Sequence, residues 1–341
     1  MTVHSNTNTA ISLDRVTKRF GSTVAVNELT VSVERGEMFG LIGPDGAGKT
    51  TTIRLMCGLV PPDQGRVRIL DLDPVRDHRR LTDSVGYLSQ RFSLYGDLSV
   101  DENVAFFAEI HGVRDYAARR DRLLDLTQLT PFRTRLADRL SGGMKQKLAL
   151  ACTLVHEPEL IILDEPTTGV DPVSRREFWK LLSEFLSQGI TIVMATPYLD
   201  EAERCARVAF LSEGHLLALD RPATLRSTLP GQLYEVIVRE HRRAIDAITH
   251  IPGVAAVQMF GERAHVRLDP VAHSAGTHSV GTHSVETHSV GSGFSRTMTP
   301  DEASDLLTSR LRAAGLDVTS VRPIQTSLED VFIARLNEAK S

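Results

Sequence analysis

The chain has 341 residues, of which 41% are hydrophobic and 24% are charged, a globular composition that excludes a fibrous or disordered protein. Because one hydrophobic core usually stops growing at about 250–300 residues, this length predicts two domains. The formal net charge is -4, from 39 Lys and Arg against 43 Asp and Glu. Such a balance gives no electrostatic reason to expect a nucleic-acid partner.

Three further features predict a soluble protein of a reducing compartment, the cytosol. No apolar stretch reaches the ~20 residues of a membrane-spanning helix. The first ten residues lack the charged and then apolar layout of a secretion signal. The three cysteines, Cys57, Cys152 and Cys205, lie far apart in the sequence, which excludes a disulfide framework and a CxxC metal pair.

The first two thirds of the chain predict strands that alternate with helices. Alternating polar and apolar positions predict strands within residues 11–36. A short apolar strand, 38–43, runs into a glycine-rich turn and then a helix that ends before Pro61. Residues 101–135 are predicted to be helical. Further strands are predicted within 158–166, 189–196 and 207–214. This order indicates an α/β fold, residues 11–228, with a largely parallel sheet.

The pattern changes after Leu229-Pro230-Gly231, and residues 231–341 predict a second, smaller domain. Its predicted elements are a strand at 232–239, a helix at 241–251, two strands around Gly261, a helix at 300–314, a strand at 316–322 and a closing helix from Ser327. The order β-α-β-β-α-β is typical of a small α+β ferredoxin-like domain.

A pentad repeat, GTHSV-GTHSV-ETHSV, lies within residues 271–297 of this domain. It places His278, His283 and His288 five residues apart, which suggests a metal-binding tract or a low-complexity loop. Five residues advance about 140° around a helix, so the imidazoles share no helical face. On a strand they would alternate between the two faces. The spacing and the Gly, Ser and Thr content favour the loop.

A GxxxxGK[ST] motif follows the predicted strand 38–43 and opens a helix. Its glycines allow backbone N–H groups to surround phosphates, and the helix start adds a favourable dipole. Lys49 is expected to reach the β- and γ-phosphates of ATP, and the Thr50 hydroxyl to ligate Mg²⁺. The alternative is an ordinary glycine-rich turn. The residues expected to bind ATP are Gly43, Pro44, Asp45, Gly46, Ala47, Gly48, Lys49, Thr50 and Thr51.

Two carboxylates end the apolar run at 160–163 and could complete a nucleotide site. Asp164 is placed to hold Mg²⁺ and its hydration shell, and Glu165 to polarise the attacking water. Alternatively, both acids simply end a strand in solvent.

A Ser-Gly-Gly turn, Ser141, Gly142 and Gly143, begins another predicted helix and offers a hydroxyl and free N–H groups to an anion. The alternative is a plain serine N-cap. Because one chain needs no second phosphate cradle for the same nucleotide, this turn is expected to close on ATP held by another subunit.

Over roughly residues 11–225 these ordered motifs resemble the ATP-binding subunits of ABC (ATP-binding cassette) transporters. The resemblance implies a P-loop NTPase cassette, with a mixed sheet and a helical subdomain at about 91–139, that hydrolyses ATP with Mg²⁺. It also implies that Phe20 stacks on adenine, where the alternative is a core aromatic, and that Gln90 contacts Mg²⁺ or the attacking water. Asp171 would communicate between two cassettes; the alternative is a turn-forming Asp.

The closing segment SLEDVFIARL, residues 327–336, resembles that of daunorubicin-resistance-type drug exporters. Their ATP-binding subunits pair with a separate integral-membrane permease. The resemblance therefore implies efflux of a drug-like or lipophilic compound. It places this chain peripherally at the cytoplasmic face of the cell membrane, with a second cassette as a homodimer or heterodimer partner.

Pro197 departs from the family pattern, because it occupies the position of a histidine that contacts the γ-phosphate. Proline donates no hydrogen bond, and losing one such contact typically costs a factor of about 10²–10³ in rate. This chain could hydrolyse ATP slowly with Glu165, or pair with a competent cassette, a hypothesis to which Asp45 also contributes. His156 is interpreted as a surface residue at a helix end.

Three alternative functions belong to other classes of protein. A chromosome-maintenance ATPase needs long heptad arms, and no sustained heptad is present here. A ribosome-associated factor of this type carries two cassettes, whereas this chain has one phosphate loop. The third alternative is a nucleotide-binding regulatory subunit that never hydrolyses ATP, and Pro197 is the residue that supports it.

Overall fold

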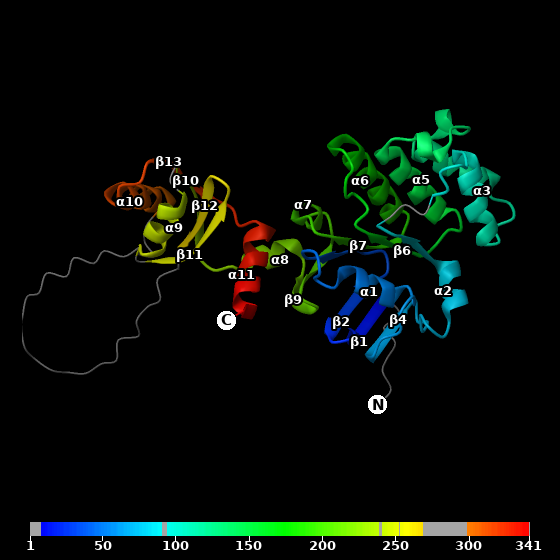
Figure 1. Cartoon of the computed structure of the whole chain (residues 1–341), viewed down its shortest axis with the longest axis horizontal. Helices are drawn as coiled ribbons and strands as arrows, with labels where there is room; N and C mark the ends of the chain where they lie inside the picture. Colours follow the sequence, from blue (N-terminus) through cyan, green and yellow to red (C-terminus); the bar gives the residue numbers. More distant parts are fainter. Residues whose placement is uncertain (1–7, 91–93, 239–240, 252, 269–298, 341) are drawn as a thin grey trace, which may run out of the picture. The chain divides into compact units, whose positions relative to one another are not determined.

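A computed structural model describes residues 8–90, 94–238, 241–251, 253–268 and 299–340. The chain forms two compact units (Figure 1). The first comprises Met1–Leu225 with Phe332–Ser341, and the second comprises Arg226–Val331. This division differs from the predicted bounds mainly in the last helix, which groups with the first unit from Phe332 onward. Within the described ranges, no helix is both long and apolar enough to span a membrane.

The first unit contains two sheets and a set of helices. Its strands are β1 (Thr9–Phe20), β2 (Thr23–Glu34), β3 (Met38–Ile42), β4 (Gln64–Ile69), β5 (Val85–Leu88), β6 (Leu160–Asp164), β7 (Thr191–Thr196), β8 (Arg207–Ser212) and β9 (His215–Asp220). Its helices are α1 (Lys49–Met56), α2 (His78–Ser84), α3 (Val100–Ile110), α4 (Ala117–Leu126), η1 (Thr130–Phe132), η2 (Ala137–Arg139), α5 (Gly142–Leu154), α6 (Pro172–Ser187) and α7 (Leu199–Ala202), with α8 (Pro222–Ser227) at the boundary.

The larger sheet has the strand order β5-β6-β7-β3-β8-β9 and is parallel except for the β8–β9 pair. Every residue of β3, β6 and β7 is buried, because helices cover both faces of a parallel sheet. Figure 1 shows α1 on one face and α5 and α6 on the other. The parallel register brings the carboxyl ends of β3, β6 and β7 to one edge, where ligands of such sheets bind.

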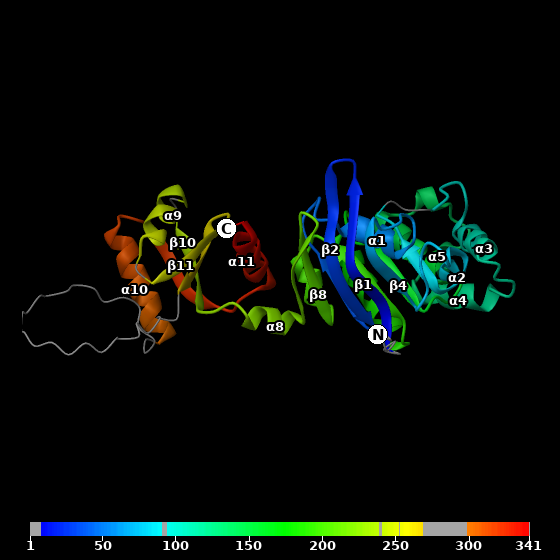
Figure 2. The same cartoon turned by 90° about the horizontal axis from the view of Figure 1, so that it is seen from below.

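The smaller sheet is antiparallel, with the order β2-β1-β4 (Figure 2). Its apolar face packs against α1 and the larger sheet in one core that includes Ile11, Ile53, Ile162 and Val193, all fully buried. Alternate residues of β6 face opposite ways, so Leu160 and Ile162 belong to this core. This layered packing holds the start of α1 against the sheet edge.

The helices between β5 and β6 occupy the region predicted as a helical subdomain, whose residues 91–93 lie outside the described ranges. α3 begins with a capping box in which Ser99 and Glu102 satisfy each other's backbone N–H groups. The fully buried Asn103 amide donates to the carbonyl oxygens of Tyr95, Leu98 and Ser99. Asn103 thereby fixes the segment from Tyr95 to Ser99.

The second unit contains a four-stranded antiparallel sheet with the order β11-β12-β10-β13. Its elements are β10 (Gln232–Val238), α9 (His241–Thr249), β11 (Val254–Phe260), β12 (Arg263–Leu268), α10 (Pro300–Ala313) and β13 (Val318–Ile324), followed by α11 (Leu328–Lys340). The order is β-α-β-β-α-β around a core that includes Tyr234, Ile248 and Leu307. The histidine repeat at 271–297, predicted as a loop, lies outside the described residues.

The first residues of the SLEDVFIARL segment anchor the start of α11 to β12. Asp330 accepts hydrogen bonds from the backbone N–H and the hydroxyl of Ser327. Its other oxygen lies 2.7 Å from Nδ1 of His265 on β12. The motif therefore has a role within the second unit, because it fixes the helix start to the sheet.

Candidate functional site

The glycine-rich loop connects β3 to α1 at the carboxyl edge of the larger sheet. A Cβ on Gly43 would lie 2.3 Å from the carbonyl oxygen of Leu211, and one on Gly48, whose φ is +99°, would lie 2.5 Å from that of Ala25. Both positions therefore require glycine. Gly46 also has a positive φ, and no atom lies within 4 Å of its Cβ direction, so the loop is open on that side.

The start of α1 is built to receive an anion. Its N-cap residue, Gly48, provides no side-chain cap. The first N–H groups of the helix therefore have no side-chain acceptor at this end, and the helix dipole favours negative charge there. The loop and the helix start together fit the phosphates of a nucleotide.

The Lys49 side chain is buried beside this loop, with 4% of it exposed. Its ammonium group donates to the carbonyl oxygens of Gly43, at 2.8 Å, and Pro44, at 3.0 Å. It also lies 3.3 Å from Oε1 of Glu165. The Lys49 ammonium group therefore contacts both the glycine-rich loop and Glu165, the acid that follows β6.

Thr50 and Asp164 bring two oxygens together beside the loop, with the Thr50 hydroxyl 3.2 Å from Oδ1 of Asp164. Burial and the neighbouring Glu165 raise the pKa of Asp164, while the Thr50 hydrogen bond and Lys49 lower it, and the net direction is upward. Oxygen donors beside a phosphate cradle suit Mg²⁺, which uses few protein ligands together with phosphates and water. The described residues contain no cluster of three or more His, Cys, Asp or Glu side chains that could hold a metal by itself.

Glu165 occupies a left-handed backbone conformation, φ +49°, which is strained for a residue with a Cβ. Its backbone N–H donates to the carbonyl oxygen of Ala195 on β7. The Gln90 amide donates to its Oε2 at 2.9 Å, and the Thr168 hydroxyl lies 3.4 Å from the same oxygen. The structure thus brings Gln90 and Glu165 together and adds Thr168, which the sequence reasoning missed although it follows closely in the same segment.

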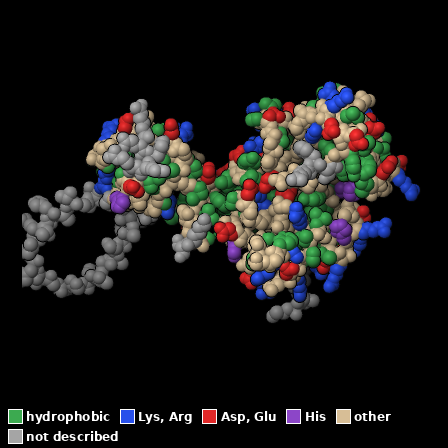
Figure 3. All heavy atoms as spheres, in the orientation of Figure 1, with side chains coloured by type: hydrophobic (Ala, Val, Ile, Leu, Met, Phe, Trp, Pro, Cys, Tyr) green, Lys and Arg blue, Asp and Glu red, His purple; other side chains and the backbone are tan. Residues whose placement is uncertain are grey.

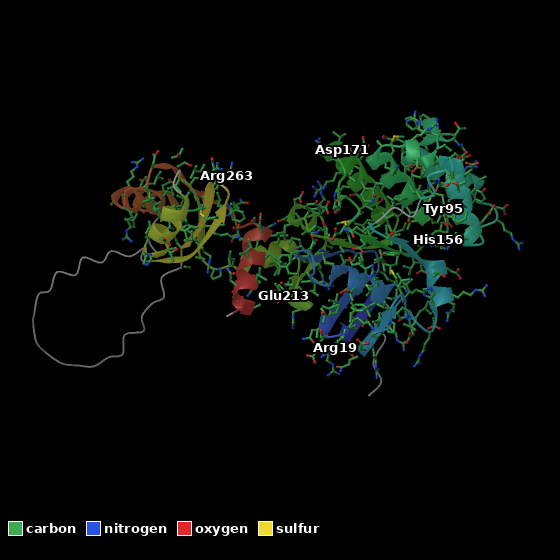
Figure 4. The ribbon with its side chains drawn as sticks, viewed as in Figure 1. Arg19, Tyr95, His156, Asp171, Glu213 and Arg263 are labelled. Carbon is green, nitrogen blue, oxygen red and sulfur yellow. The ribbon has the colours of Figure 1, made fainter. Side chains whose placement is uncertain are left out.

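Residues 45–51, Gln90 and Glu165 line a cavity of about 760 Å³, whereas Asp164 and Thr168 are not part of its lining. Its walls also include the start of β2 (Thr23, Val24 and Ala25) and Glu213 in the β8–β9 turn, where Figure 4 labels it. Sequence reasoning did not identify them, because no motif links these distant segments to the loop. Phe20 lies outside the lining but is 48% exposed, with the Lys18 ammonium 5.5 Å from its ring centroid. The exposure excludes a core aromatic.

The Ser-Gly-Gly turn and Asp171 form a second cluster at the starts of α5 and α6. Ser141 caps α5 by accepting the backbone N–H of Met144. Asp171, labelled in Figure 4, caps α6 by accepting the N–H groups of Val173 and Ser174, and its bonds to Ser174 lower its pKa. None of these residues lines the cavity around Lys49.

The two glycines of this turn have different surroundings. A Cβ on Gly143 would lie 2.2 Å from the Ser174 hydroxyl, so Gly143 permits close packing of α5 against α6. A Cβ on Gly142 would meet no atom within 4 Å. Gly142 therefore faces open space, where another molecule can approach.

Pro197 follows β7 and offers no donor. The next residue, Tyr198, donates its backbone N–H to the Thr196 hydroxyl, and its ring lies below the Arg175 guanidinium, 4.8 Å from its centroid. Arg175 also bonds Asp200 and Glu201. These contacts fix the segment that follows Pro197.

His156 does lie at a helix end, but its interpretation as a surface residue is wrong. Its ring stacks on that of His111 with 3.8 Å between centroids, and both of its ring nitrogens are buried. Burial, with a smaller effect from His111, lowers the pKa of His156 to about 4. The prediction failed because the partner ring comes from the end of α3, 45 residues away in the sequence.

Comparison with known proteins places this site in a family. The sequence model of the ABC transporter family matches residues 26–168. A daunorubicin resistance ATP-binding protein from Streptomyces coeruleorubidus is 35% identical over 72% of this chain and 78% of its own length. The chain belongs to the ABC transporter ATP-binding proteins. A Nod factor export ATP-binding protein from Bradyrhizobium diazoefficiens is 40% identical over 64% of this chain and 72% of that protein.

A probable multidrug ABC transporter ATP-binding protein of Escherichia coli is 40% identical over 78% of this chain but only 48% of its own length. The chain spans about half the length of that relative and of its Shigella flexneri counterpart.

Solved structures confirm the cassette fold. The ATP-binding subunit of an ABC transporter has a TM-score of 0.60 and 28% identity over 64% of this chain and 92% of that chain. A dimeric bacterial ABC transporter cassette has a TM-score of 0.56 and 27% identity over 62% of this chain and 98% of that chain. The predicted P-loop fold of the ABC cassette, with its mixed sheet and helices, is therefore correct.

Proposed function

We propose that this chain binds MgATP in the 760 Å³ cavity and hydrolyses it as the ATP-binding subunit of an exporter. The convergence of Lys49 and Gln90 on Glu165 carries the proposal, because the ammonium group lies within ion-pair distance and the amide within hydrogen-bond distance of the Glu165 carboxylate. They come from three separate segments of the chain. A structural ion pair alone would not require the open loop beside them.

Each residue of the site has a distinct role in this proposal. The loop from Gly43 to Thr51 binds the phosphates through its N–H groups, and Lys49 exchanges Glu165 for the β- and γ-phosphates. Thr50, Gln90 and Asp164 would hold Mg²⁺, which supplies positive charge against the phosphates when bound. Glu165 accepts a proton from the attacking water. Gln90 orients the Glu165 carboxylate toward that water.

A second cassette completes the site in this proposal. Ser141, Gly142 and Gly143 lie apart from the cavity of their own chain, and Gly142 faces open space. We assign them to the γ-phosphate of ATP bound by the partner cassette, with Asp171 beside them to communicate between the two sites. Phe20, exposed at the end of β1, would stack on adenine.

The names of the relatives support an export role. They are multidrug, daunorubicin resistance and Nod factor export ATP-binding proteins. We therefore propose that the chain acts at the cytoplasmic face of the cell membrane, bound to a separate permease, and drives efflux of a drug-like or lipophilic compound. We also propose that the second unit, predicted at 231–341 and ending at Val331 in the structure, is a ferredoxin-like accessory domain.

Pro197 favours a second candidate, a weakly hydrolytic or regulatory cassette paired with a competent one. In the described structure the residue after β7 supplies no side-chain donor toward the γ-phosphate position. The two candidates differ in the turnover of the isolated chain and not in its ability to bind nucleotide.

The proposal is tested by comparing Lys49→Ala with Lys180→Ala, which removes the same charge from an exposed position of α6. A charge-assisted hydrogen bond contributes about 1.5–3 kcal/mol, so we expect Lys49→Ala to weaken binding of a fluorescent ATP analogue about 10–100-fold. Lys180→Ala should bind as the wild type does. Unchanged affinity in Lys49→Ala would contradict the assignment of the cavity.

A further inference from the structure

A second concave site in the first unit lies away from the nucleotide cavity. It is a hollow of about 450 Å³ between β4, the residues before it and the loop that precedes α2. Three arginines line it, Arg66 and Arg68 from β4 and Arg76 from the loop, and we call it the arginine hollow. It shares no residue with the lining of the nucleotide cavity.

The strand pattern explains why two of these arginines face the same way. Arg66 and Arg68 are two positions apart and exposed, while Val67 and Ile69 are buried on the other face of β4. Arg76 is also exposed. Figure 3 shows Lys and Arg side chains projecting from the surface around α2.

In the described part of the chain none of the three guanidinium groups makes a hydrogen bond or an ion pair, although the charges of Arg76 and Arg68 act on the nearby Asp73 and contribute to lowering its pKa. Asp73, the one acid in the lining, uses its Oδ1 to accept the backbone N–H groups of Val75 and Arg76. Asp14 lies opposite Arg66 in the β1–β4 ladder, but its carboxylate lies 3.7 Å from Arg15. Three cations and one carboxylate therefore face one hollow, an excess of positive charge in a chain whose net charge is -4.

Another hollow of the first unit shows that clustered arginines need not be free. It has a volume of about 390 Å³ and is also lined by three arginines. There Arg35 pairs with Glu159, Arg119 pairs with Glu157, and Arg122 bonds the Gln188 amide oxygen. The arginines of that hollow bond other protein side chains. The guanidinium N–H groups of the arginine hollow remain available to a ligand.

We propose that the arginine hollow binds a phosphate group of a ligand distinct from the transported compound and from the ATP of the cassette. Planar guanidinium groups donate paired hydrogen bonds that match phosphate oxygens, and three of them neutralise more than one negative charge. The phosphate can belong to a soluble phosphate compound or to the headgroup of an anionic lipid. This site is independent of the proposed function, because its residues take no part in binding ATP.

The test uses the full chain with its nucleotide cavity saturated by a non-hydrolysable ATP analogue, so that the phosphate loop is occupied. R66Q/R68Q/R76Q is compared with R114Q/K180Q/R312Q, which removes the same three charges from exposed positions outside the hollow. In calorimetric titrations with pyrophosphate we expect the wild type and the control variant to bind alike. R66Q/R68Q/R76Q should bind at least tenfold more weakly. Unchanged thermal unfolding verifies that it is folded.

A parallel sedimentation assay distinguishes the two sources of phosphate. Vesicles of phosphatidylcholine with phosphatidic acid are compared with phosphatidylcholine alone. Loss of binding to the acidic vesicles in R66Q/R68Q/R76Q, but not in the control, identifies a lipid headgroup. Loss of pyrophosphate binding only identifies a soluble phosphate compound. Equal behaviour of the two triple variants toward both probes, or no binding of either probe by the wild type, would overturn the proposal.

Discussion

Lys49 and Glu165 form a buried ion pair, with 3.3 Å between the ammonium nitrogen and Oε1. The pair joins the residue expected to bind phosphate to the residue expected to activate water. A buried charge that loses its partner is strongly destabilised, so each group needs the other while phosphate is absent. In the proposed function, a γ-phosphate would give Lys49 a new partner and free Glu165. We therefore expect nucleotide binding to be coupled to the position of the proposed general base.

Gln90 should affect turnover more than binding. Its amide holds the second oxygen of Glu165 at 2.9 Å. In Gln90→Ala the carboxylate loses this contact, so we expect kcat for ATP to fall about 10–100-fold, in the range for a misplaced catalytic group. The affinity for an ATP analogue should change less than threefold. A large loss of affinity with kcat retained would show that Gln90 acts mainly in binding.

Substitutions of the adjacent glycines Gly142 and Gly143 should separate folding from association. Gly142→Ala places a methyl group in open space, so the isolated chain should keep its unfolding temperature while ATP-dependent pairing weakens. Gly143→Ala places a methyl group 2.2 Å from the Ser174 hydroxyl, and overpacking of this kind costs about 1–3 kcal/mol. Thermal unfolding measures the difference. The double variant Gly143→Ala/Ser174→Gly should recover part of the loss, and failure to recover would place the strain elsewhere.

Pro197→His should raise ATPase activity if Pro197 limits turnover. A transition-state donor of this kind contributes a factor of about 10²–10³, so even partial restoration should exceed tenfold. Phosphate release by the purified chain measures the effect, and Pro197→Ala is the control because it restores no side-chain donor. No gain with histidine would show that another feature limits hydrolysis.

The buried His156 should make stability depend on pH. Its pKa is lowered to about 4 from an ordinary 6.5, so the unfolded chain binds this proton first as the pH falls. The free energy of unfolding therefore keeps this group's full contribution above about pH 6.5 and loses about 3 kcal/mol as the pH falls toward 4.

His156→Phe keeps a ring against His111 and should flatten this acid dependence in urea unfolding curves. His78→Gln, at an exposed position of α2, should leave the slope unchanged. An unaltered slope in His156→Phe would exclude His156 as its source.

The sequence predicted the parts of the site that lie within one short segment. The loop at 43–51, the acids after β6 and the Ser-Gly-Gly turn each carry their chemistry in consecutive residues, and their strands and helices formed as the hydrophobic pattern indicated. The contact of Gln90 with Glu165 was not visible from the residues, because it joins positions 75 residues apart. The family resemblance implied only that Gln90 contacts Mg²⁺ or the attacking water.

What the sequence could not predict depends on segments that meet only in the folded chain. The cavity wall formed by β2 and Glu213 belongs to this class, as does the stacking of His156 on His111. The arginine hollow is another case, because Arg76 joins Arg66 and Arg68 through the loop before α2. Isolated arginines in a sequence of balanced charge carry no signal of this kind.

Sedimentation of the purified chain with a non-hydrolysable ATP analogue and Mg²⁺ tests most directly whether triphosphate joins two cassettes. A dimer should form with the analogue but not with ADP, and both Lys49→Ala and Ser141→Arg should remain monomeric, whereas Lys180→Ala should dimerise. For a chain that pairs only with a different cassette, the same dependence should appear when that partner is added. Dimer formation that does not depend on the nucleotide, or that persists in both variants, would contradict the claim that a triphosphate joins the two cassettes.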